Sequence, residues 1–257
     1  MSFVRRESRP GVDIVTLDRP DRLNALGPEV VGALCETFGA IEADGTPVVV
    51  LRAEGKHFCA GGDFAAMERT GALDAYRDLE PFNRLVRTLA ARRTLLIAAV
   101  QGAAVGAGLG LVLLADFVVA APDARFGAAF AQVGLVADTG VLYSLPRRVG
   151  LTRAKELLLT GRKLDAEEAQ AWGIVTRIAE EGDVTGAAIA LADETLAATP
   201  PHAIELGRRL LDQAEGATLE QALVLEQLSQ SLCRQTDDHH EAAAALRQRR
   251  PPKFTGR

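Results

Sequence analysis

Residues Thr94 to Asp116 read TLLIAAVQGAAVGAGLGLVLLAD, which joins a strand signal to a glycine-rich turn and a helix. Thr94 to Val100 is an aliphatic run of strand length, so we expect a buried strand there. Glycine and alanine follow it and are small enough for a helix to begin directly against the sheet. A strand that leads through such a turn into a helix favours an α/β fold, and the turn aims unpaired N–H groups into one crevice.

A second glycine-rich turn follows another expected strand. Pro47 to Arg52 reads PVVVLR, and GKHFCAGGDFAAM comes directly after it at Gly55 to Met67. Gly61 and Gly62 permit a tight turn with exposed amides, and Asp63 is well placed to cap a helix that begins at Phe64. Two such turns side by side could point two amides at one oxygen, as an oxyanion hole requires. For either turn alone, close packing of the chain is the simpler explanation.

Short apolar runs alternate with helix-like stretches in the first part of the chain. After Arg147 the segments are mainly helical, with one possible short strand before residue 180. Val12 to Leu17 alternates with the period of a strand, and Ile174 to Ile178 allows a short one. We expect helices over Pro28 to Ala43, Leu73 to Ala91, Thr152 to Thr160, Ala166 to Trp172, Asp183 to Thr199, His202 to Ala214, Leu219 to Cys233 and Asp238 to Arg249. Strands separated by helices of this length favour βαβ crossovers and a largely parallel sheet. The chain therefore predicts an α/β core, residues 1–198, and a helical C-terminal region, residues 199–257.

Composition narrows the classes of function. The 257 residues are 48% hydrophobic and 25% charged, which suits one large domain or a domain with a helical appendage. A net charge of −5 without a basic stripe argues against nucleic acid as a partner. The three cysteines lack CxxC spacing, so we interpret them as reduced core thiols of a cytoplasmic protein. No clustered Cys or His suggests a metal site, and no apolar run approaches the roughly 18 residues of a membrane span.

Six ordered motifs carry a family resemblance: RPDRLNAL from Arg19, HFCAGGDF from His57, VQGAAVGAGLGLVLLAD from Val100, ARFGAAFAQVGLVADTG from Ala124, GRKLDAEEAQAWGIV from Gly161, and the terminal RRPPKFTGR. Together they resemble the enoyl-CoA hydratase/isomerase (crotonase) superfamily over essentially the whole chain. The resemblance implies a crotonase fold of repeated ββα units whose C-terminal helices serve trimerisation. It also implies a homotrimer or dimer of trimers that binds an acyl-CoA thioester, with coenzyme A as part of the substrate and no tightly bound cofactor.

The resemblance assigns site residues motif by motif. The two oxyanion amides are those of Gly62 and Ala107. Alanine rather than glycine at position 107 keeps the N–H but narrows the allowed backbone conformations. The residues that match substrate or CoA contacts of the family are Arg22, Ala60, Gly61, Asp63, Phe64, Phe130, Lys253 and Phe254. Arg22 matches a cation that meets a phosphate, and Lys253 and Phe254 match a tail that often reaches the CoA.

The resemblance also separates isomerase from hydratase chemistry. Hydratases of the family use two glutamates, and this chain has Gly110 and Phe130 in their places. Neither residue can transfer a proton, whereas hydration needs two acid/base groups. Asp138 remains as the acid/base candidate. It lies in a segment similar to that of the isomerase branch that acts in phenylacetate breakdown. Low-polarity surroundings would raise its pKa toward a range useful for moving a proton.

Several alternatives remain open. Asp138 could cap the helix that follows it, alone or as a second role. The segment DTGVLYSL also resembles the aryl-CoA dehalogenase branch, but Phe130 and the lack of histidine between residues 58 and 201 argue against that chemistry. Ordinary enoyl-CoA hydration and a catalytically silent acyl-CoA-binding or assembly subunit are further alternatives. Glu80 is an outside candidate for a second carboxylate in the site, while Asp116 is expected to have a structural rather than a catalytic role.

Overall fold

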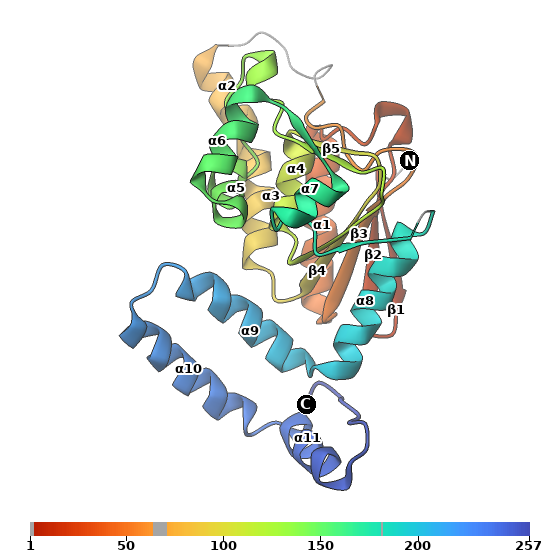
Figure 1. Cartoon of the computed structure of the whole chain (residues 1–257), viewed down its shortest axis with the longest axis vertical. Coiled ribbons are helices and arrows are strands. Elements are labelled where there is room, and N and C mark those ends of the chain that lie inside the picture. Colours follow the sequence, from red (N-terminus) through yellow and green to blue (C-terminus); the bar gives the residue numbers. More distant parts are fainter. Residues whose placement is uncertain (1–2, 64–70, 181) are drawn as a thin grey trace.

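The chain folds as two sheets covered by helices, followed by a helical arm (Figure 1). A computed structural model describes residues 3–63, 71–180 and 182–257. Six strands form one sheet in the order β1-β2-β3-β4-β6-β9, and β5-β7-β8 form a second. The strands are β1 (Val4–Arg9), β2 (Val12–Leu17), β3 (Val48–Ala53), β4 (Leu95–Val100), β5 (Ala103–Val105), β6 (Phe117–Ala120), β7 (Arg125–Gly127), β8 (Lys163–Asp165) and β9 (Arg177–Ile178).

The α-helices in the described ranges cover the large sheet and continue past it. They are α1 (Pro28–Asp44), α2 (Ala72–Asp78), α3 (Glu80–Ala91), α4 (Ala107–Leu114), α5 (Val141–Val149), α6 (Leu151–Thr160), α7 (Ala166–Ala171), α8 (Val184–Ala198), α9 (Pro201–Ala214), α10 (Leu219–Cys233) and α11 (Asp237–Gln248). None of them is both long enough and apolar enough to cross a membrane.

The large sheet is buried on both faces, as its near-continuous aliphatic strands require. From β2 to β9 all neighbouring strands pair in parallel, and β1 alone is antiparallel to its neighbour. Successive side chains of a strand point to opposite faces. In β3, Val49 and Leu51 belong to the main core with α1, α3 and α4, whereas Val48 and Val50 pack with α8. The predicted parallel α/β core is therefore confirmed.

One predicted helix is interrupted where it meets the site. The spacing of Leu73 to Ala91 predicts a single helix, but the structure has α2 and α3 with a break at Leu79. Pro81 has no N–H to donate to the carbonyl four residues earlier, so a continuous helix would lack a hydrogen bond there. The break leaves Leu79 and Phe82 at the wall of the cavity described below.

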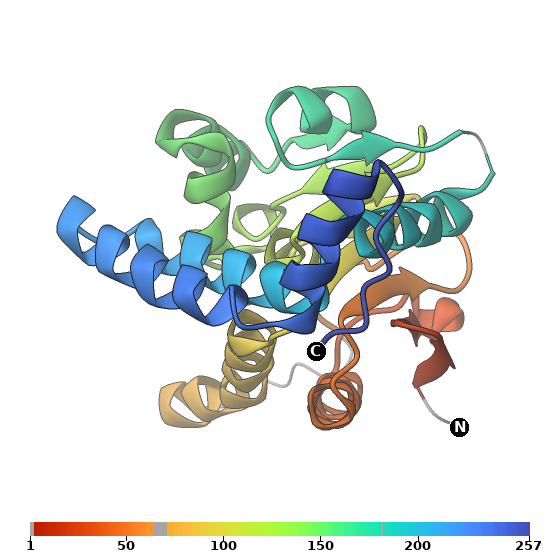
Figure 2. The ribbon, with the colours of Figure 1, turned by 90° about the horizontal axis from the view of Figure 1, so that it is seen from below.

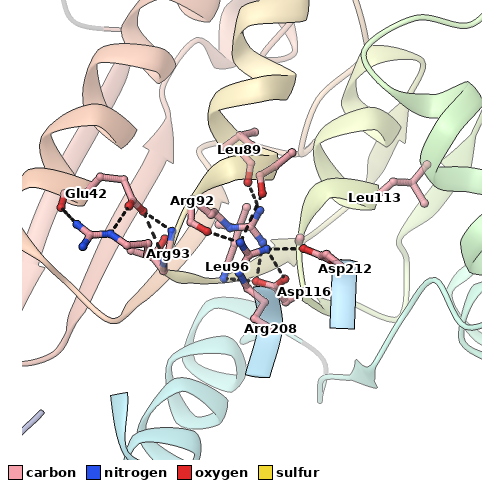
Figure 3. A network of polar contacts seen from close by, with 12 residues as sticks. Glu42, Leu89, Arg92, Arg93, Leu96, Leu113, Asp116, Arg208 and Asp212 are labelled. Carbon is pink, nitrogen blue, oxygen red and sulfur yellow. Dashed lines mark hydrogen bonds and ion pairs between the residues drawn. The ribbon is translucent and has the colours of Figure 1, made fainter. Parts of the chain in front are cut away.

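The C-terminal arm is joined to the core by a buried ionic network (Figure 3). Arg92 donates to Asp116 at 2.5 Å, and Asp116 also accepts from the N–H of Leu96 at 2.7 Å. Arg208 of α9 donates to the carbonyl oxygen of Arg92 and lies 3.7 Å from Asp116. The structural role assigned to Asp116 is confirmed, because it connects β4 and α9.

Beyond this network α9 and α10 pack side by side and extend past the core (Figure 2). No residue of α10 is buried, and its leucines at positions 219, 223, 228 and 232 are exposed in a single copy of the chain. The predicted trimer would cover apolar surface of this kind. The division at residues 198 and 199 stays a prediction; α8 ends at Ala198 and α9 begins at Pro201.

Candidate active site

Three segments far apart in sequence run side by side and form the floor of the site. The N–H of Leu26 donates to the carbonyl oxygen of Gly61 at 2.8 Å, which joins the first motif to the first glycine-rich turn. Cys59 pairs with Ala104 in a parallel bridge, and the N–H of Val105 donates to Cys59 at 3.0 Å. The two glycine-rich turns, which follow β3 and β4, are thus held together by backbone hydrogen bonds.

In the described part of the chain, the second turn leaves the amide of Ala107 unpaired. Gly106 has φ of 57° and ψ of −123°, a conformation that an L-residue rarely adopts. Ala107 is then the first residue of α4, and an N–H in the first turn of a helix has no partner within that helix. Because Ala107 is already helical, alanine at this position causes no strain.

The turn that carries Gly62 packs against the start of α4. A Cβ built on the neighbouring residue, Gly61, would lie 3.0 Å from the carbonyl oxygen of Val105 and 3.8 Å from the nitrogen of Ala107. In the ranges 3–63, 71–180 and 182–257, neither Gly62 nor Ala107 donates its N–H to another group. Two unpaired N–H groups on adjoining turns can receive an oxygen that gains negative charge.

These turns open into a small apolar cavity that contains one acid. The cavity has a volume of about 100 Å³. Its lining includes Ala60, Gly61, Gly62, Gly106 and Ala107 from the two turns, Leu79 and Phe82 from the interrupted helix, and Phe130, Val133, Leu135 and Asp138 from the segment after β7. Asp138 is the one carboxylic acid among these lining residues, so the predicted acid and the two predicted amides face the same space.

The environment of Asp138 favours its neutral form. Burial raises the pKa of the Asp138 carboxyl above its ordinary value of 3.8, and a hydrogen bond from the Thr139 hydroxyl partly opposes that rise. The Thr139 oxygen lies 2.9 Å from Oδ1 of Asp138. A raised pKa makes the carboxylate a stronger base toward a substrate proton.

The prediction that Asp138 caps the following helix is wrong. The helix α5 begins at Val141 after Gly140, and no side chain caps it. Only the backbone carbonyl of Asp138 takes part there, accepting the N–H of Val141 at 2.9 Å. Gly140 has φ of 75°, and this turn between Asp138 and the helix directs the carboxylate into the cavity instead.

The positions of the hydratase glutamates hold no acid. Gly110 lies inside α4, and Phe130 is 7% exposed and lines the cavity. Glu80, the outside candidate, is exposed and forms an ion pair with Arg87 at 2.7 Å. It does not line the cavity.

Three residues have supporting roles that the sequence analysis did not assign. The side chain of Asn24, 1% exposed, donates to the carbonyls of Glu54 and His57 at 2.9 Å and accepts from the N–H of Arg19. Nδ1 of His57 accepts from the N–H of Ala103 at 3.1 Å and so ties the first turn to the second. Thr139 binds Asp138, as above. Asparagine tolerates the left-handed conformation and pairs with both backbone groups, which is the signal that could have identified Asn24.

The predicted CoA-binding residues divide by location. Ala60 and Gly61 line the cavity. Arg22 is exposed, in a short 3-10 helix (Pro20–Arg22) next to Leu23, whose carbonyl accepts the N–H of Ala60 at 3.0 Å. The carboxylate of Asp63 pairs with Arg19 at 2.7 Å, and Phe64 lies outside the described residues.

Lys253 and Phe254, the two predicted tail contacts, lie away from the cavity of Asp138 within a single copy of the chain. Phe254 lines a separate cavity of about 520 Å³ between the core and the arm. The N–H of Lys253 donates to Glu241 of α11 at 2.8 Å. Neither residue lines the cavity of Asp138, so a CoA contact by this tail stays a prediction.

The cysteine nearest the site is not a nucleophile. Burial raises the pKa of the Cys59 thiol to about 12, so the thiolate is scarce at neutral pH. All three cysteines are free thiols. No group of three or more His, Cys, Asp or Glu in the described part of the chain could hold a metal ion.

We expect Asp138→Asn to stabilise the fold in a pH-dependent way. The folded carboxyl has a raised pKa, so ionisation costs stability once the pH exceeds the ordinary value of 3.8, and the full cost is present above the folded pKa. Thermal unfolding should therefore give similar Tm values for parent and Asp138→Asn below about pH 4, and a higher Tm for the variant at about pH 7. Exposed Asp123→Asn is the control. A Tm difference that does not grow with pH would contradict this account of Asp138.

Comparisons with known proteins give one family. The profile described as enoyl-CoA hydratase/isomerase matches residues 7–257. The 1,2-epoxyphenylacetyl-CoA isomerase of Escherichia coli (strain K12) is 37% identical over 262 residues, which cover 100% of both chains. Among solved structures, an enoyl-CoA hydratase from Polaromonas sp. JS666 is 33% identical with a TM-score of 0.92, and the alignment covers 98% of this chain and 99% of that one. An enoyl-CoA hydratase from Mycobacterium tuberculosis H37Rv is 34% identical with a TM-score of 0.89 over 100% of both chains.

The two solved structures share the fold of this chain over nearly its whole length, and the names of the three relatives divide between isomerase and hydratase. The motifs, the fold and the full-length matches agree, and the chain belongs to the enoyl-CoA hydratase/isomerase family.

Proposed function

We propose that this protein is an acyl-CoA isomerase in which Asp138 moves a proton. The carboxylate would remove a proton from C2 of a 3-enoyl thioester. The electrons would shift to form a dienolate, whose thioester oxygen accepts hydrogen bonds from the amides of Gly62 and Ala107. The carboxyl group of Asp138 would then return the proton to C4, giving the conjugated 2-enoyl thioester without net gain or loss of atoms.

A single observation carries the proposal: among the described residues that line the cavity, Asp138 is the one acid, it shares this cavity with the amides of Gly62 and Ala107, and residues without acid/base groups occupy positions 110 and 130. Isomerisation requires one base that takes and returns a proton, whereas hydration also requires a group that activates water. The raised pKa of Asp138 supports the assignment, because a base works best when its pKa approaches the operating pH.

The lining of the cavity supports an apolar acyl group. Leu79, Phe82, Phe130 and Val133 surround Asp138 and offer no hydrogen-bonding side chain. Two substrates fit this chemistry: a straight-chain 3-enoyl-CoA, and a ring epoxide of phenylacetyl-CoA like that named for the Escherichia coli relative. Arg22, exposed and close to the backbone of Ala60, is the proposed contact for a CoA phosphate.

The test supplies the purified protein with each substrate in turn. With a 3-enoyl-CoA we expect formation of the conjugated 2-enoyl thioester, measured as a rise in its absorbance. With the ring epoxide we expect an isomer of unchanged mass, identified by mass spectrometry and NMR. Turnover in one arm identifies the acyl group. If neither substrate reacts while CoA thioesters still bind, the isomerase proposal is wrong and a binding subunit is favoured.

A further inference from the structure

The space that a side chain at position 110 would need is occupied by Thr139. A Cβ added at Gly110 would lie 2.7 Å from the carbonyl oxygen of Thr139 and 2.9 Å from its Cβ and from its Cγ2. These distances are shorter than van der Waals contact permits. Two of the three atoms belong to the rigid part of Thr139, so a rotation of its side chain cannot relieve the clash.

Thr139 is itself held in an unusual conformation. Its φ is 48°, in the left-handed region that β-branched residues rarely enter, and it is 1% exposed. Its hydroxyl donates to Oδ1 of Asp138 at 2.9 Å. The next residue, Gly140, also has positive φ and approaches Val86 of α3, where a Cβ would lie 3.2 Å from Cγ1. The carboxylate thus depends on a turn that is wedged between α3 and α4.

We propose that Gly110 and Thr139 are positioning residues that together set the location and the orientation of the Asp138 carboxyl. The missing side chain at position 110 makes room for the backbone of Thr139, and the Thr139 hydroxyl fixes one oxygen of the carboxylate. A carboxylate has about four acceptor sites on two oxygens, so this bond leaves capacity for the substrate proton. The proposal rests on the proposed function for its kinetic consequences but not for its effect on the pKa.

One consequence concerns the choice between hydration and isomerisation. A glutamate at position 110 and the observed Thr139 turn need the same space, so this backbone cannot hold both. Gly110→Glu should therefore not create a second catalytic acid. It should displace Asp138 and lower isomerisation.

The test compares variants that change space or hydrogen bonding separately. We expect Gly110→Ala to lower kcat roughly a hundredfold with little change in KM, because the displaced group moves the proton and does not bind CoA. Gly39→Ala, on an exposed position of α1 with no atom near the added Cβ, should keep the parent kcat and controls for glycine replacement in a helix.

The hydroxyl is tested with matched side chains. Thr139→Val keeps the shape and removes the donor, so the pKa of Asp138 should rise and the acidic limb of the kcat profile should move to higher pH. Thr139→Ser keeps the donor and should restore the parent profile. Circular dichroism and Tm confirm that each variant is folded.

A second readout does not depend on turnover. The carboxyl carbon of Asp138, assigned in NMR spectra by its loss in Asp138→Asn, should titrate at higher pH in Thr139→Val than in the parent. That result supports the positioning role even if no acyl-CoA is turned over and the proposed function fails. If the parent isomerises substrate and Asp138→Asn does not, but Gly110→Ala and Thr139→Val keep the parent kcat and the parent titration, the positioning role is wrong while the proposed function stands.

Discussion

Replacing Asp138 with asparagine should lower kcat for isomerisation by a factor of roughly 10² to 10⁴, the range that positioned acid/base groups supply. Asparagine has nearly the same volume as aspartate but cannot take up and return a proton at the pH of the reaction. The amides of Gly62 and Ala107 and the apolar lining stay in place, so the variant should still bind the thioester. Steady-state kinetics with a 3-enoyl-CoA should therefore show a loss in kcat and a small change in KM.

Glu80→Gln is the matched control for this experiment. Glu80 is the other carboxylate that the sequence offers near the acyl group, but it is exposed and paired with Arg87. We expect its replacement to leave kcat within about a factor of two, as is usual for an exposed residue away from the reaction. A variant Asp138→Asn that keeps the parent kcat, or an equal loss in Glu80→Gln, would contradict the assignment of the base.

The largest effect on stability should come from Asp116. Burial lowers the pKa of the Arg92 guanidinium and opposes its charge, and the nearby carboxylate of Asp116 compensates. Asp116→Ala would leave Arg92, 1% exposed, and Arg208, 9% exposed, without this carboxylate. Breaking a buried pair by removing one partner costs roughly 3 to 5 kcal/mol. Urea unfolding at one protein concentration should show that loss in the free energy of unfolding.

Asp212 provides the comparison for Asp116. It pairs with the same Arg208 at 3.0 Å, yet its side chain is 64% exposed. Exposed pairs contribute about 0 to 1 kcal/mol, so Asp212→Ala should unfold close to the parent. Similar unfolding of Asp116→Ala and the parent would show that the network does not secure the arm to the core.

Long aliphatic strands and the helices of the arm could be predicted from the sequence because local periodicity specifies them. Val12 to Leu17 is a strand with the predicted bounds, and Leu219 to Cys233 is a helix with the predicted bounds. The edge strand Val4–Arg9, VRRESR, was missed because most of its side chains are exposed and charged or polar. The second sheet was missed because three-residue strands are too short to show a period.

Parts of the site could also be predicted from the sequence, and other parts could not. Asp138 and the two amides follow from motifs that the family resemblance interprets, and the structure brings all three to one cavity. The helix-capping role of Asp138 could not be judged from the order Asp-Thr-Gly, since it depends on where α5 begins. The contact between Gly110 and Thr139 joins residues from different helices and turns, and only the tertiary packing reveals it.

The central claim is that one carboxylate moves a proton and that no second acid serves hydration. The most direct test measures initial rates of 3-enoyl-CoA isomerisation and of crotonyl-CoA hydration on one preparation of the parent protein, with Asp138→Asn alongside. The account predicts that isomerisation greatly exceeds hydration in the parent and is lost in Asp138→Asn. Hydration of crotonyl-CoA that equals or exceeds isomerisation in the parent would contradict it.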